Sequence, residues 1–340
     1  MRNRNPTAAQ GERFPSAMKP GSRHILSQFG SLLGLLSLCL ILTASSSRFL
    51  TPANLVNIAR QSAINSIISV GMLLNLLTAG IDLSVGSILA LSICLMGVAI
   101  SKWNASALMA VSLCLGTGIC LGLLNGLLLT KLRLPHPFIS TLGTKNIARG
   151  LALIVTAAAP IAGFPKAIQY AGAGFVGPVP ASFVLVLLVF TLFHVFLNRT
   201  AQGKHIYAVG GNREAARLSG VDIDRTLILV YALSGFMAAL GGLVLAGRVN
   251  AAFPLAGLDY DLDAIAACII GGASFLGGSG TVWGTLIGAM VMAVLRNGLN
   301  LIGVSPDFQT VAIGVVIIAA VYVDVLRHKA EAGPRFAMSL

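Results

Sequence analysis

Long apolar stretches alternate with short polar or Gly/Pro-rich joints along most of the 340-residue chain. Several stretches reach or exceed about 18 apolar residues with few charges, which is the length that a helix needs to cross a bilayer. The pattern predicts ten membrane spans. They lie at residues 28–47, 56–79, 83–101, 106–129, 138–157, 181–198, 226–247, 263–279, 281–302 and 308–326. A version with eight spans, in which 56–101 is partly re-entrant, fits the same pattern.

The composition agrees with a membrane protein. Hydrophobic residues make up 56% of the chain and charged residues 10%, whereas a soluble globular chain has about 25% charged residues. We therefore expect an all-α polytopic membrane protein. Five cysteines are scattered through the apolar segments without a CxxC or metal-ligand spacing. We interpret them as packing residues and expect neither a disulfide framework nor a zinc site.

Basic residues are distributed unevenly among the joints. When the spans are threaded alternately, fifteen Lys and Arg residues fall on one side of the membrane and four on the other, or five if Arg60 is counted. The basic side holds both chain ends, the joint around Lys131 and the loop 199–225. The positive-inside rule places that side in the cytoplasm. The net charge of +12 therefore indicates orientation, and nucleic acid is not an expected partner.

The predicted organisation has three parts. A cytoplasmic N-terminal tail (1–27) precedes a transmembrane domain (28–326), which carries the cytoplasmic loop 199–225, and a cytoplasmic tail (327–340) follows. The sequence TASSS at 43–47 is similar to a signal-peptide cleavage site. The basic region before it is longer than in most signal peptides, so we expect the first span to be retained.

The two halves of the chain contain similar segments. LLNGLLLTKLRLPHPFISTLG (123–143) resembles VLRNGLNLIGVSPDFQTVAIG (294–314), and GIDLS (80–84) occupies the position that GLDYD (257–261) has in the second half. The threading turns the first hairpin in the cytoplasm and the second outside. We therefore predict two inverted-repeat halves, a layout common among transporters. Chance similarity among apolar helices is the alternative.

Motifs for catalysis and nucleotide binding are missing from the sequence. It contains no GxxxxGK[ST], HExxH or GxSxG. The five histidines lie mostly in loops or at span ends, without a carboxylate at motif spacing. We therefore expect that the chain is not an enzyme and that it binds no metal.

Acidic residues near the spans are informative, because an unpaired charge in a bilayer costs about 3 kcal/mol or more. Asp82 lies in a glycine-containing joint between two spans, which is typical of a broken helix. Two interpretations stay open: it caps the next helix, or it contacts a substrate. Asp259, Asp261 and Asp263 cluster at the external end of a span, either as a solvated rim or in the substrate pathway.

Asparagine side chains occur in several apolar helices. They can hydrogen-bond across helices or match the hydroxyl groups of a substrate. We favour packing for Asn125 and Asn297, since each precedes a glycine in the repeat. Asn75 and Asn300 remain open to both interpretations.

A short charged stretch, GGNREAARLSG (210–220), interrupts the apolar pattern. Asn212 can cap a helix start, and Glu214 then lies in the first turn, where the helix dipole favours a negative charge. Gly220 can end the helix. The stretch therefore predicts a helix of one or two turns.

Such a helix is too short to be stable alone in water, so it needs a partner surface. We expect Leu218 and the small side chain of Ala215 to enter a groove, with Glu214 and the arginines forming ion pairs at its rim. A helix that lies on its own membrane domain is the alternative.

These segments also resemble a known family. EAARLSG (214–220) is similar to the EAA-xxx-G cytoplasmic loop of permeases in binding-protein-dependent ABC importers. The resemblance covers about residues 30–326 and is to the ribose-type sugar permease branch. It is carried by GGNREAARLSGVDIDRTLILVYALSGFMAALGG (210–242), NLLTAGIDLSVGS (75–87), PFISTLGT (137–144) and IIGGASFLGGSGTVWGTLIGA (269–289). The Ile-x-Leu-Pro ending of the fuller loop is missing after Gly220, which leaves contacts beyond that residue open.

The resemblance implies a helical permease in the bacterial inner membrane that works as two membrane subunits, expected to be a homodimer. Its partners would be a periplasmic sugar-binding protein and an ABC ATPase subunit that binds the ATP, so no cofactor is expected on this chain. The short helix would couple the permease to the ATPase through Gly211, Asn212, Glu214, Ala215, Ala216, Leu218 and Gly220. The candidate substrate pathway comprises Asn75, Asp82, Phe138, Thr141, Asp263, Asn297 and Asn300.

The expected function is import of a monosaccharide, such as a ribose-like pentose. An ion-coupled secondary transporter is the alternative from another class, since inverted halves and Asp82 also fit it. A third reading keeps the ABC machinery and changes the cargo to branched-chain amino acids or another small polar solute.

Overall fold

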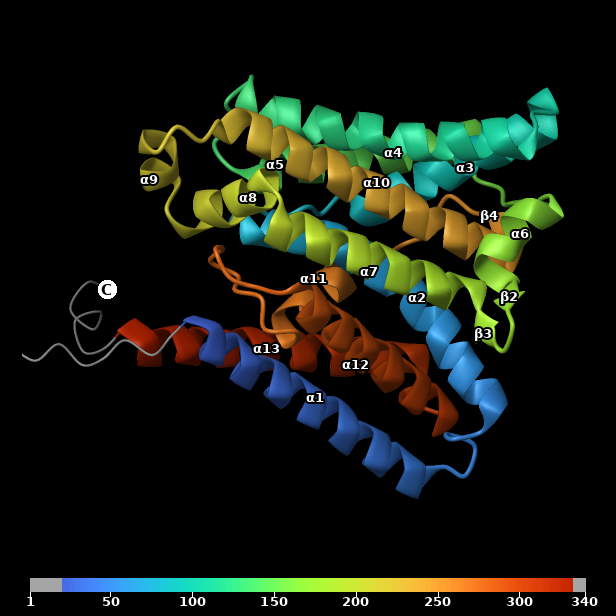
Figure 1. Ribbon diagram of the computed structural model, residues 1–340. Helices are drawn as coiled ribbons and strands as arrows, with labels where there is room; N and C mark the ends of the chain where they lie inside the picture. Colours follow the sequence, from blue (N-terminus) through green and yellow to red (C-terminus); the bar gives the residue numbers. More distant parts are fainter. Residues whose placement is uncertain (1–19, 333–340) are drawn as a thin grey trace, which may run out of the picture.

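Nearly all of the described chain is helical. Figure 1 shows the computed structural model, which describes residues 20–332. The helices are α1 (Pro20–Ser45), α2 (Pro52–Leu77), α3 (Val85–Trp103), α4 (Ala107–Thr130), α5 (Pro137–Thr156), α6 (Lys166–Ala173), α7 (Ala181–Arg199), α8 (Ala201–Gly211), α9 (Arg213–Leu218), α10 (Ile223–Val249), α11 (Tyr260–Ile270), α12 (Val282–Leu301) and α13 (Pro306–Ala332). Two antiparallel pairs of short strands join β1 (Ile161–Ala162) to β4 (Ala251–Ala252) and β2 (Phe175–Val176) to β3 (Val179–Pro180).

The helices confirm a polytopic membrane fold. Within residues 20–332, six of them are long and apolar enough to cross a membrane, namely α3, α4, α7, α10, α12 and α13. α2 and α5 have 26 and 20 residues but are less apolar. The region 56–101 lies in two long helices, α2 and α3, which are joined by residues 78–84. The count of ten spans is not established.

The predicted span 263–279 is wrong. The helix there, α11, has only 11 residues, which gives it a length of about 16 Å, roughly half of the hydrocarbon core. The chain then turns without regular structure until α12 begins. Gly272, Gly277 and Gly278 have φ angles of 87°, 92° and 72° in this turn. The left-handed Gly272 ends the helix, and Gly277 and Gly278 shape the turn that follows, although the apolar composition continues.

The predicted tails are also partly helical. α1 begins at Pro20, and α13 continues to Ala332, so both helices extend into the segments expected as tails. The rest of the predicted tails, residues 1–19 and 333–340, lies outside the described residues.

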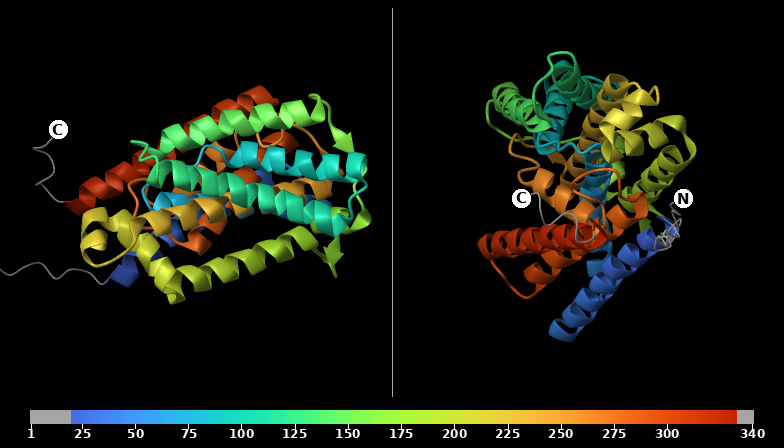
Figure 2. Two further views of the ribbon diagram at one scale, coloured as in Figure 1. Left: turned by 90° about the horizontal axis from the view of Figure 1, so that it is seen from above. Right: turned by 90° about the vertical axis from the view of Figure 1, so that its left-hand side faces the viewer.

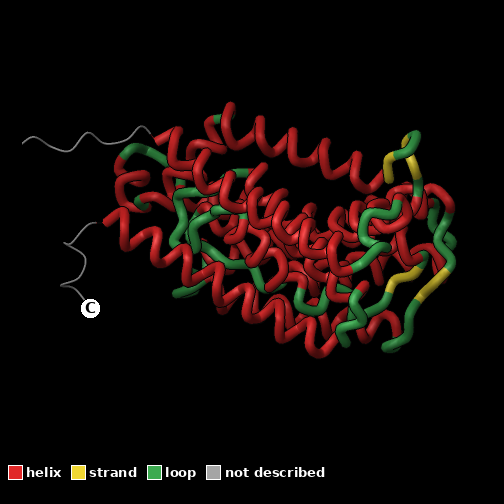
Figure 3. Tube along the Cα trace, turned by 90° about the horizontal axis from the view of Figure 1, so that it is seen from below, coloured by secondary structure: helices red, strands yellow, loops and turns green. Residues whose placement is uncertain are grey.

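The connections gather at two opposite ends of the molecule. α9, the first turn of α1 and the last turns of α13 lie at one end, as Figures 1 and 2 show. α6 and the strands lie at the other end, as the labels in Figure 1 show, and the strands are gathered there in Figure 3. The joint between α4 and α5 belongs to the α9 end, because Lys131 pairs with Asp224 in the first turn of α10 at 3.3 Å. The arrangement matches the predicted grouping of both chain ends with the charged loop.

The repeated hairpins turn at opposite ends. The α4–α5 hairpin turns at the α9 end, whereas the end of α12 lies against the start of α2, where Asn297 and Asn54 exchange two amide hydrogen bonds of 2.8 and 3.0 Å. α13 starts at Pro306, just after this contact. The two halves are therefore inverted relative to each other, as predicted.

Helix α10 lies at the centre of the packing, against α2, α3, α4 and α6. Its contact with α4 depends on glycine. A Cβ atom on Gly118 would lie 2.3 Å from the carbonyl oxygen of Gly235, and one on Gly122 would lie 2.2 Å from that of Tyr231. The two backbones are thus close enough to exclude any side chain, which is common where helices pack in membranes.

Candidate functional site

The start of α9 is capped by its own sequence. Asn212 is the N-cap residue, with an extended backbone, and its Oδ1 accepts a hydrogen bond of 2.9 Å from the backbone N–H of Ala215. Glu214 lies in the first turn and pairs with Arg217 one turn later, with 3.1 Å between Oε2 and Nε. This hydrogen bond lowers the pKa of the Glu214 carboxyl. Glu214 is therefore an exposed anion at the positive end of the helix dipole.

The end of α9 is closed by a Schellman motif. The N–H of Gly220 donates to the carbonyl of Arg217, and the N–H of Val221 donates to that of Ala216, both at 3.0 Å. The motif needs a left-handed residue after the helix, and Gly220 has a φ angle of 84°. These two bonds satisfy carbonyl groups that would otherwise lack partners.

α9 presents one face outward and one inward. Leu218 is 79% exposed, and Glu214, Ala215 and Arg217 are also exposed. Ala216 is only 5% exposed and packs with Val209, Leu227, Tyr231 and Leu129, so it anchors the helix to its own subunit. An apolar side chain as exposed as Leu218 is free to enter a groove on another protein.

The segment before α9 reaches the end of α2. Gly210, in the last turn of α8, lies so close to α2 that a Cβ atom there would be 1.7 Å from the carbonyl oxygen of Leu77. That same carbonyl accepts a hydrogen bond of 3.0 Å from the N–H of Gly278 in the turn after α11. Helix α8, helix α2 and the α11–α12 turn therefore meet at one point, directly before the joint that contains Asp82.

Asp82 is fully buried in a network of polar side chains. Its Oδ1 accepts hydrogen bonds from the backbone N–H and the hydroxyl of Ser84, and its Oδ2 accepts a bond of 2.8 Å from the hydroxyl of Ser234 on α10. Asn75 on α2 donates to Ser234, and Asn125 on α4 donates to Ser84, each at 2.8 Å. The network ties three helices to the start of α3.

This geometry bears on the two interpretations of Asp82. Ser84, not Asp82, is the N-cap residue of α3, and Asp82 supports it through the Ser84 N–H. Asp82 is 0% exposed, so nothing outside the protein reaches it in this conformation. Its position supports a role in holding the interrupted chain between α2 and α3.

The three aspartates near α11 do not form a solvated rim. Asp259 is exposed, but Asp261 and Asp263 are 2% and 4% exposed. Asp261 pairs with Lys145 of α5 at 2.6 Å, and Asp263 accepts two bonds of 2.7 and 2.8 Å from Arg296 of α12. The solvated-rim interpretation is therefore wrong for two of the three residues, because each carboxylate has a cation from a neighbouring helix.

Three basic residues lie inside the predicted spans and were not among the predicted functional residues. These are Lys145, Arg149 and Arg296, of which Arg149 donates to the backbone carbonyls of Pro254 and Ala256. A basic residue in the interior of an apolar helix needs a partner, and this signal was available. The partners lie more than thirty residues away and are not evident from local patterns.

The remaining candidate residues lie in different places. Asn300 accepts a bond of 2.8 Å from Gln309, next to the Asn297–Asn54 pair. Phe138 is 45% exposed at the start of α5, and buried Thr141 donates to the carbonyl of Pro137 at 3.1 Å. The structure therefore brings Asn75 and Asp82 into one network, with Thr141 3.4 Å from the carbonyl oxygen of the adjoining Ile81, and holds Asn297 and Asn300 together near the end of α12. It does not bring all seven predicted pathway residues to one site.

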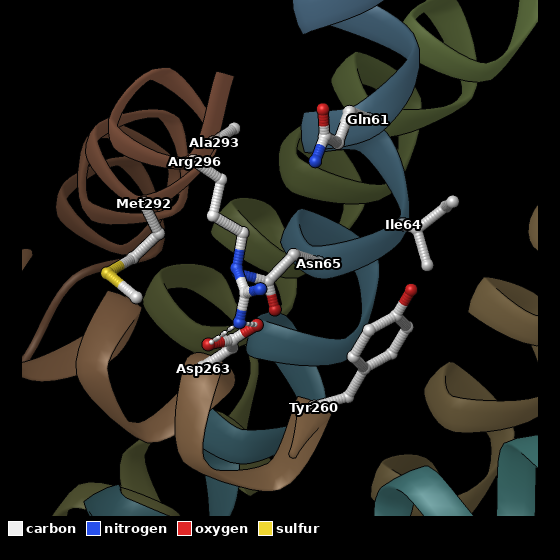
Figure 4. Close-up of a pocket in the computed structure, with 8 residues that line it drawn as sticks. All are labelled: Gln61, Ile64, Asn65, Tyr260, Asp263, Met292, Ala293 and Arg296. Atoms are coloured by element: carbon white, nitrogen blue, oxygen red, sulfur yellow. Dashed lines mark hydrogen bonds and ion pairs between the residues drawn. The ribbon is translucent and has the colours of Figure 1, made fainter. Parts of the chain in front are cut away.

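Asp263 lines a cavity between α2, α11 and α12 (Figure 4). The cavity has a volume of about 100 Å³. Its lining residues are Gln61, Ile64, Asn65, Tyr260, Asp263, Met292, Ala293 and Arg296. Five of these carry polar groups, although the cavity lies between largely apolar helices.

Comparison with known proteins agrees with this architecture. A family model described as branched-chain amino acid transport system / permease component matches residues 54–321. The chain is 42% identical over 303 residues to the ribose import permease protein RbsC of Bacillus subtilis (strain 168), covering 88% of this chain and 93% of that protein. No solved structure matches.

Two further relatives have other names. The galactose/methyl galactoside import permease protein MglC of Escherichia coli (strain K12) is 37% identical, covering 89% of this chain and 95% of the relative. The D-allose transport system permease protein AlsC of the same strain is 39% identical, covering 84% and 87%. The family match runs from α2 into α13 and includes α9, the network of Asp82 and the cavity at Asp263. The chain therefore belongs to the family of branched-chain amino acid transport system permease components.

Proposed function

We propose that this chain is the membrane permease subunit of an ATP-driven ABC importer for a monosaccharide. The observation that carries the proposal is α9, a helix capped at both ends that presents Leu218 outward at the end shared by α1 and α13. The names of the relatives, which refer to ribose, galactose/methyl galactoside and D-allose, support a monosaccharide as cargo. A ribose-like pentose is our preferred substrate.

The proposed complex contains two copies of this chain in the bacterial inner membrane, with both chain ends in the cytoplasm. A periplasmic binding protein delivers the sugar, and ATP is bound by a separate ABC ATPase subunit. α9 is the coupling helix: Leu218 and Ala215 enter a groove of the ATPase, and Glu214 and Arg217 lie at its rim. The basic residues counted on this side support the orientation.

Contacts of α9 and of the preceding helix α8 connect them to the membrane helices α10 and α2. Ala216 fixes α9 to the first turns of α10, and Gly210 lies against the end of α2. α2 and α10 are also the helices whose Asn75 and Ser234 hold the network of Asp82. A tilt of α9 would therefore change the positions of both helices around the interrupted joint.

The energetics set a requirement for this mechanism. ATP binding must favour one of two arrangements of the helices over the other by a few kcal/mol, on the order of 3 to 5, to shift the population usefully. Contacts of α9 with the ATPase contribute only if they differ between the two arrangements.

Reconstitution tests the proposal. The chain would be purified with the ABC ATPase subunit and the periplasmic binding protein of the proposed complex and placed in proteoliposomes. We expect accumulation of radiolabelled D-ribose that needs both ATP and the loaded binding protein, and no accumulation by the permease alone. Uphill uptake by the permease alone in a proton gradient would instead establish a secondary transporter, and accumulation of leucine but not ribose would change the cargo.

A further inference from the structure

We propose that the cavity around Asp263 and Arg296 is a hydroxyl-recognition site for the sugar inside the permease itself. This inference rests on the proposed function and extends it, because it assigns part of the substrate selectivity to the membrane subunit. The residues concerned come from three helices: Gln61 and Asn65 from α2, Tyr260 and Asp263 from α11, and Arg296 from α12.

One hydrogen-bond donor and one acceptor in this cavity have no hydrogen-bond partner. The Nη2 of Arg296 is occupied by both carboxylate oxygens of Asp263, whereas its Nε is buried without a hydrogen-bond partner. The Oδ1 of Asn65 is also buried without a partner. Figure 4 shows both side chains extending into the same space. Burying such groups unpaired is costly. Eleven buried side-chain atoms of the described residues lack a partner, and among them only these two belong to residues that line this cavity, where a ligand can reach them.

The chemistry of a hydroxyl group suits these two atoms. A hydroxyl group donates one hydrogen bond and accepts others, so a single hydroxyl satisfies Asn65 Oδ1 as donor and Arg296 Nε as acceptor. Gln61 and Tyr260 add groups that can both donate and accept. The cavity of about 100 Å³ is several times the roughly 10–15 Å³ that one water needs. It therefore has room for a hydroxyl-bearing part of a monosaccharide.

The two ion pairs of α11 differ in whether they line the cavity. The ion pairs Asp263–Arg296 and Asp261–Lys145 are alike in burial. The side chains of the two aspartates are 6% and 3% exposed, and the side chains of Arg296 and Lys145 are 32% and 33% exposed. Only the first pair lines the cavity. The second pair fixes α11 to α5 without adjoining the cavity, so it provides a matched control for a purely structural role.

The test uses the reconstituted complex of permease, ATPase and binding protein. Asn65→Leu removes the acceptor, and Arg296→Lys keeps the charge opposite Asp263 but removes the Nε donor. Lys145→Arg is the matched control at the other pair. Uptake of D-ribose and of its 2-, 3- and 5-deoxy analogues is measured for each, and each variant rate is divided by the wild-type rate for the same sugar. Delivery by the binding protein cancels in that ratio.

We expect Asn65→Leu and Arg296→Lys to lower D-ribose uptake about 3- to 10-fold, as for one lost hydrogen bond, and the loss to disappear for the one analogue that lacks the recognised hydroxyl. Lys145→Arg should stay within about twofold of wild type for every sugar. Equal losses for all sugars would mean a structural role only, and no loss would mean that the cavity holds water only; either result overturns the proposal. If the wild-type complex transports no sugar, the proposed function fails instead.

Discussion

At the scale of single residues, the buried polar groups differ in whether they adjoin a cavity. Asp82 accepts three hydrogen bonds in a fully buried network, in which Asn75 Oδ1 and Asn125 Oδ1 are left without a partner. Asn65 Oδ1 and Arg296 Nε are also buried without a partner, but both residues line the cavity. The first arrangement is typical of a structural centre and the second of a place that receives a ligand. The sequence does not separate them, since both consist of polar residues in or beside apolar helices.

Replacing Asp82 tests the structural role. In Asp82→Asn, an NH₂ group replaces one acceptor oxygen, so either Ser84 or Ser234 loses the acceptor for its hydroxyl hydrogen at a fully buried position. We expect the stability of the complex to fall by about 1–3 kcal/mol and sugar uptake to fall with it. Thermal unfolding of the purified complex and uptake in proteoliposomes measure the two effects.

Asp259→Asn provides the control, because Asp259 occupies the corresponding place in GLDYD and is exposed. It should change neither stability nor uptake. Unchanged stability and uptake in Asp82→Asn would contradict the role assigned to the network.

At the scale of elements, α9 was predictable and α11 was not. The caps of α9 are local signals: Asn212 acts on the next turn, and Gly220 adopts the left-handed conformation that ends the helix. α11 ends at Ile270, although the apolar run continues past it, because glycines with positive φ follow. The partners of its aspartates, Lys145 and Arg296, come from α5 and α12, and sequence spacing carries no information about such distant contacts.

The charge of α9 gives a second prediction. Glu214→Lys places a positive charge in the first turn of α9 and opposite Arg217, so it removes an ion pair and opposes the helix dipole. We expect complexes that assemble but whose ATP hydrolysis no longer responds to the sugar-loaded binding protein, with uptake reduced at least about tenfold.

Asp224→Lys is the matched control, since this exposed carboxylate lies in the first turn of α10, outside α9. It should hydrolyse ATP and import sugar nearly as the wild type does. Import at the wild-type rate by assembled Glu214→Lys complexes would count against the coupling role.

Two adjacent glycines test the contact between α8 and α2. A Cβ atom on Gly210 would lie 1.7 Å from the Leu77 carbonyl oxygen and 2.8 Å from the backbone nitrogen of Gly278, whereas one on Gly211 would have nothing within 4 Å. Gly210→Ala should therefore displace α8 and lower both the yield of the complex and uptake by several-fold. Gly211→Ala should leave the yield of the complex unchanged, and similar yields for the two variants would refute the contact.

At the scale of the whole molecule, the arrangement of the ends follows the distribution of basic residues, as the sequence indicated. α9 and the described ends of α1 and α13 lie together, opposite α6 and the strands. The number of spans was harder to predict, because hydropathy does not distinguish a half-length helix with a glycine turn from a full crossing.

Labelling from each side of the membrane tests the orientation. Ser219→Cys, directly after α9, should react with a membrane-impermeant maleimide only in inside-out vesicles. Lys102→Cys, in the last turn of α3, should react only in right-side-out cells. The native cysteines set the background in the parent chain. The reverse pattern would invert the proposed topology and place α9 out of reach of an ATPase.

The short length of α11 has a consequence for how the protein is made. A segment of 11 residues with two carboxylates in its first turn has too little apolar length to enter a bilayer alone. Its stable insertion must wait until Arg296 emerges from the ribosome to join Lys145, which is already in place. Nascent chains that end before residue 282 should therefore leave the start of α11 open to water, and a cysteine in place of the buried Ala264, which keeps both aspartates, should lose its reactivity only when α12 has been synthesised.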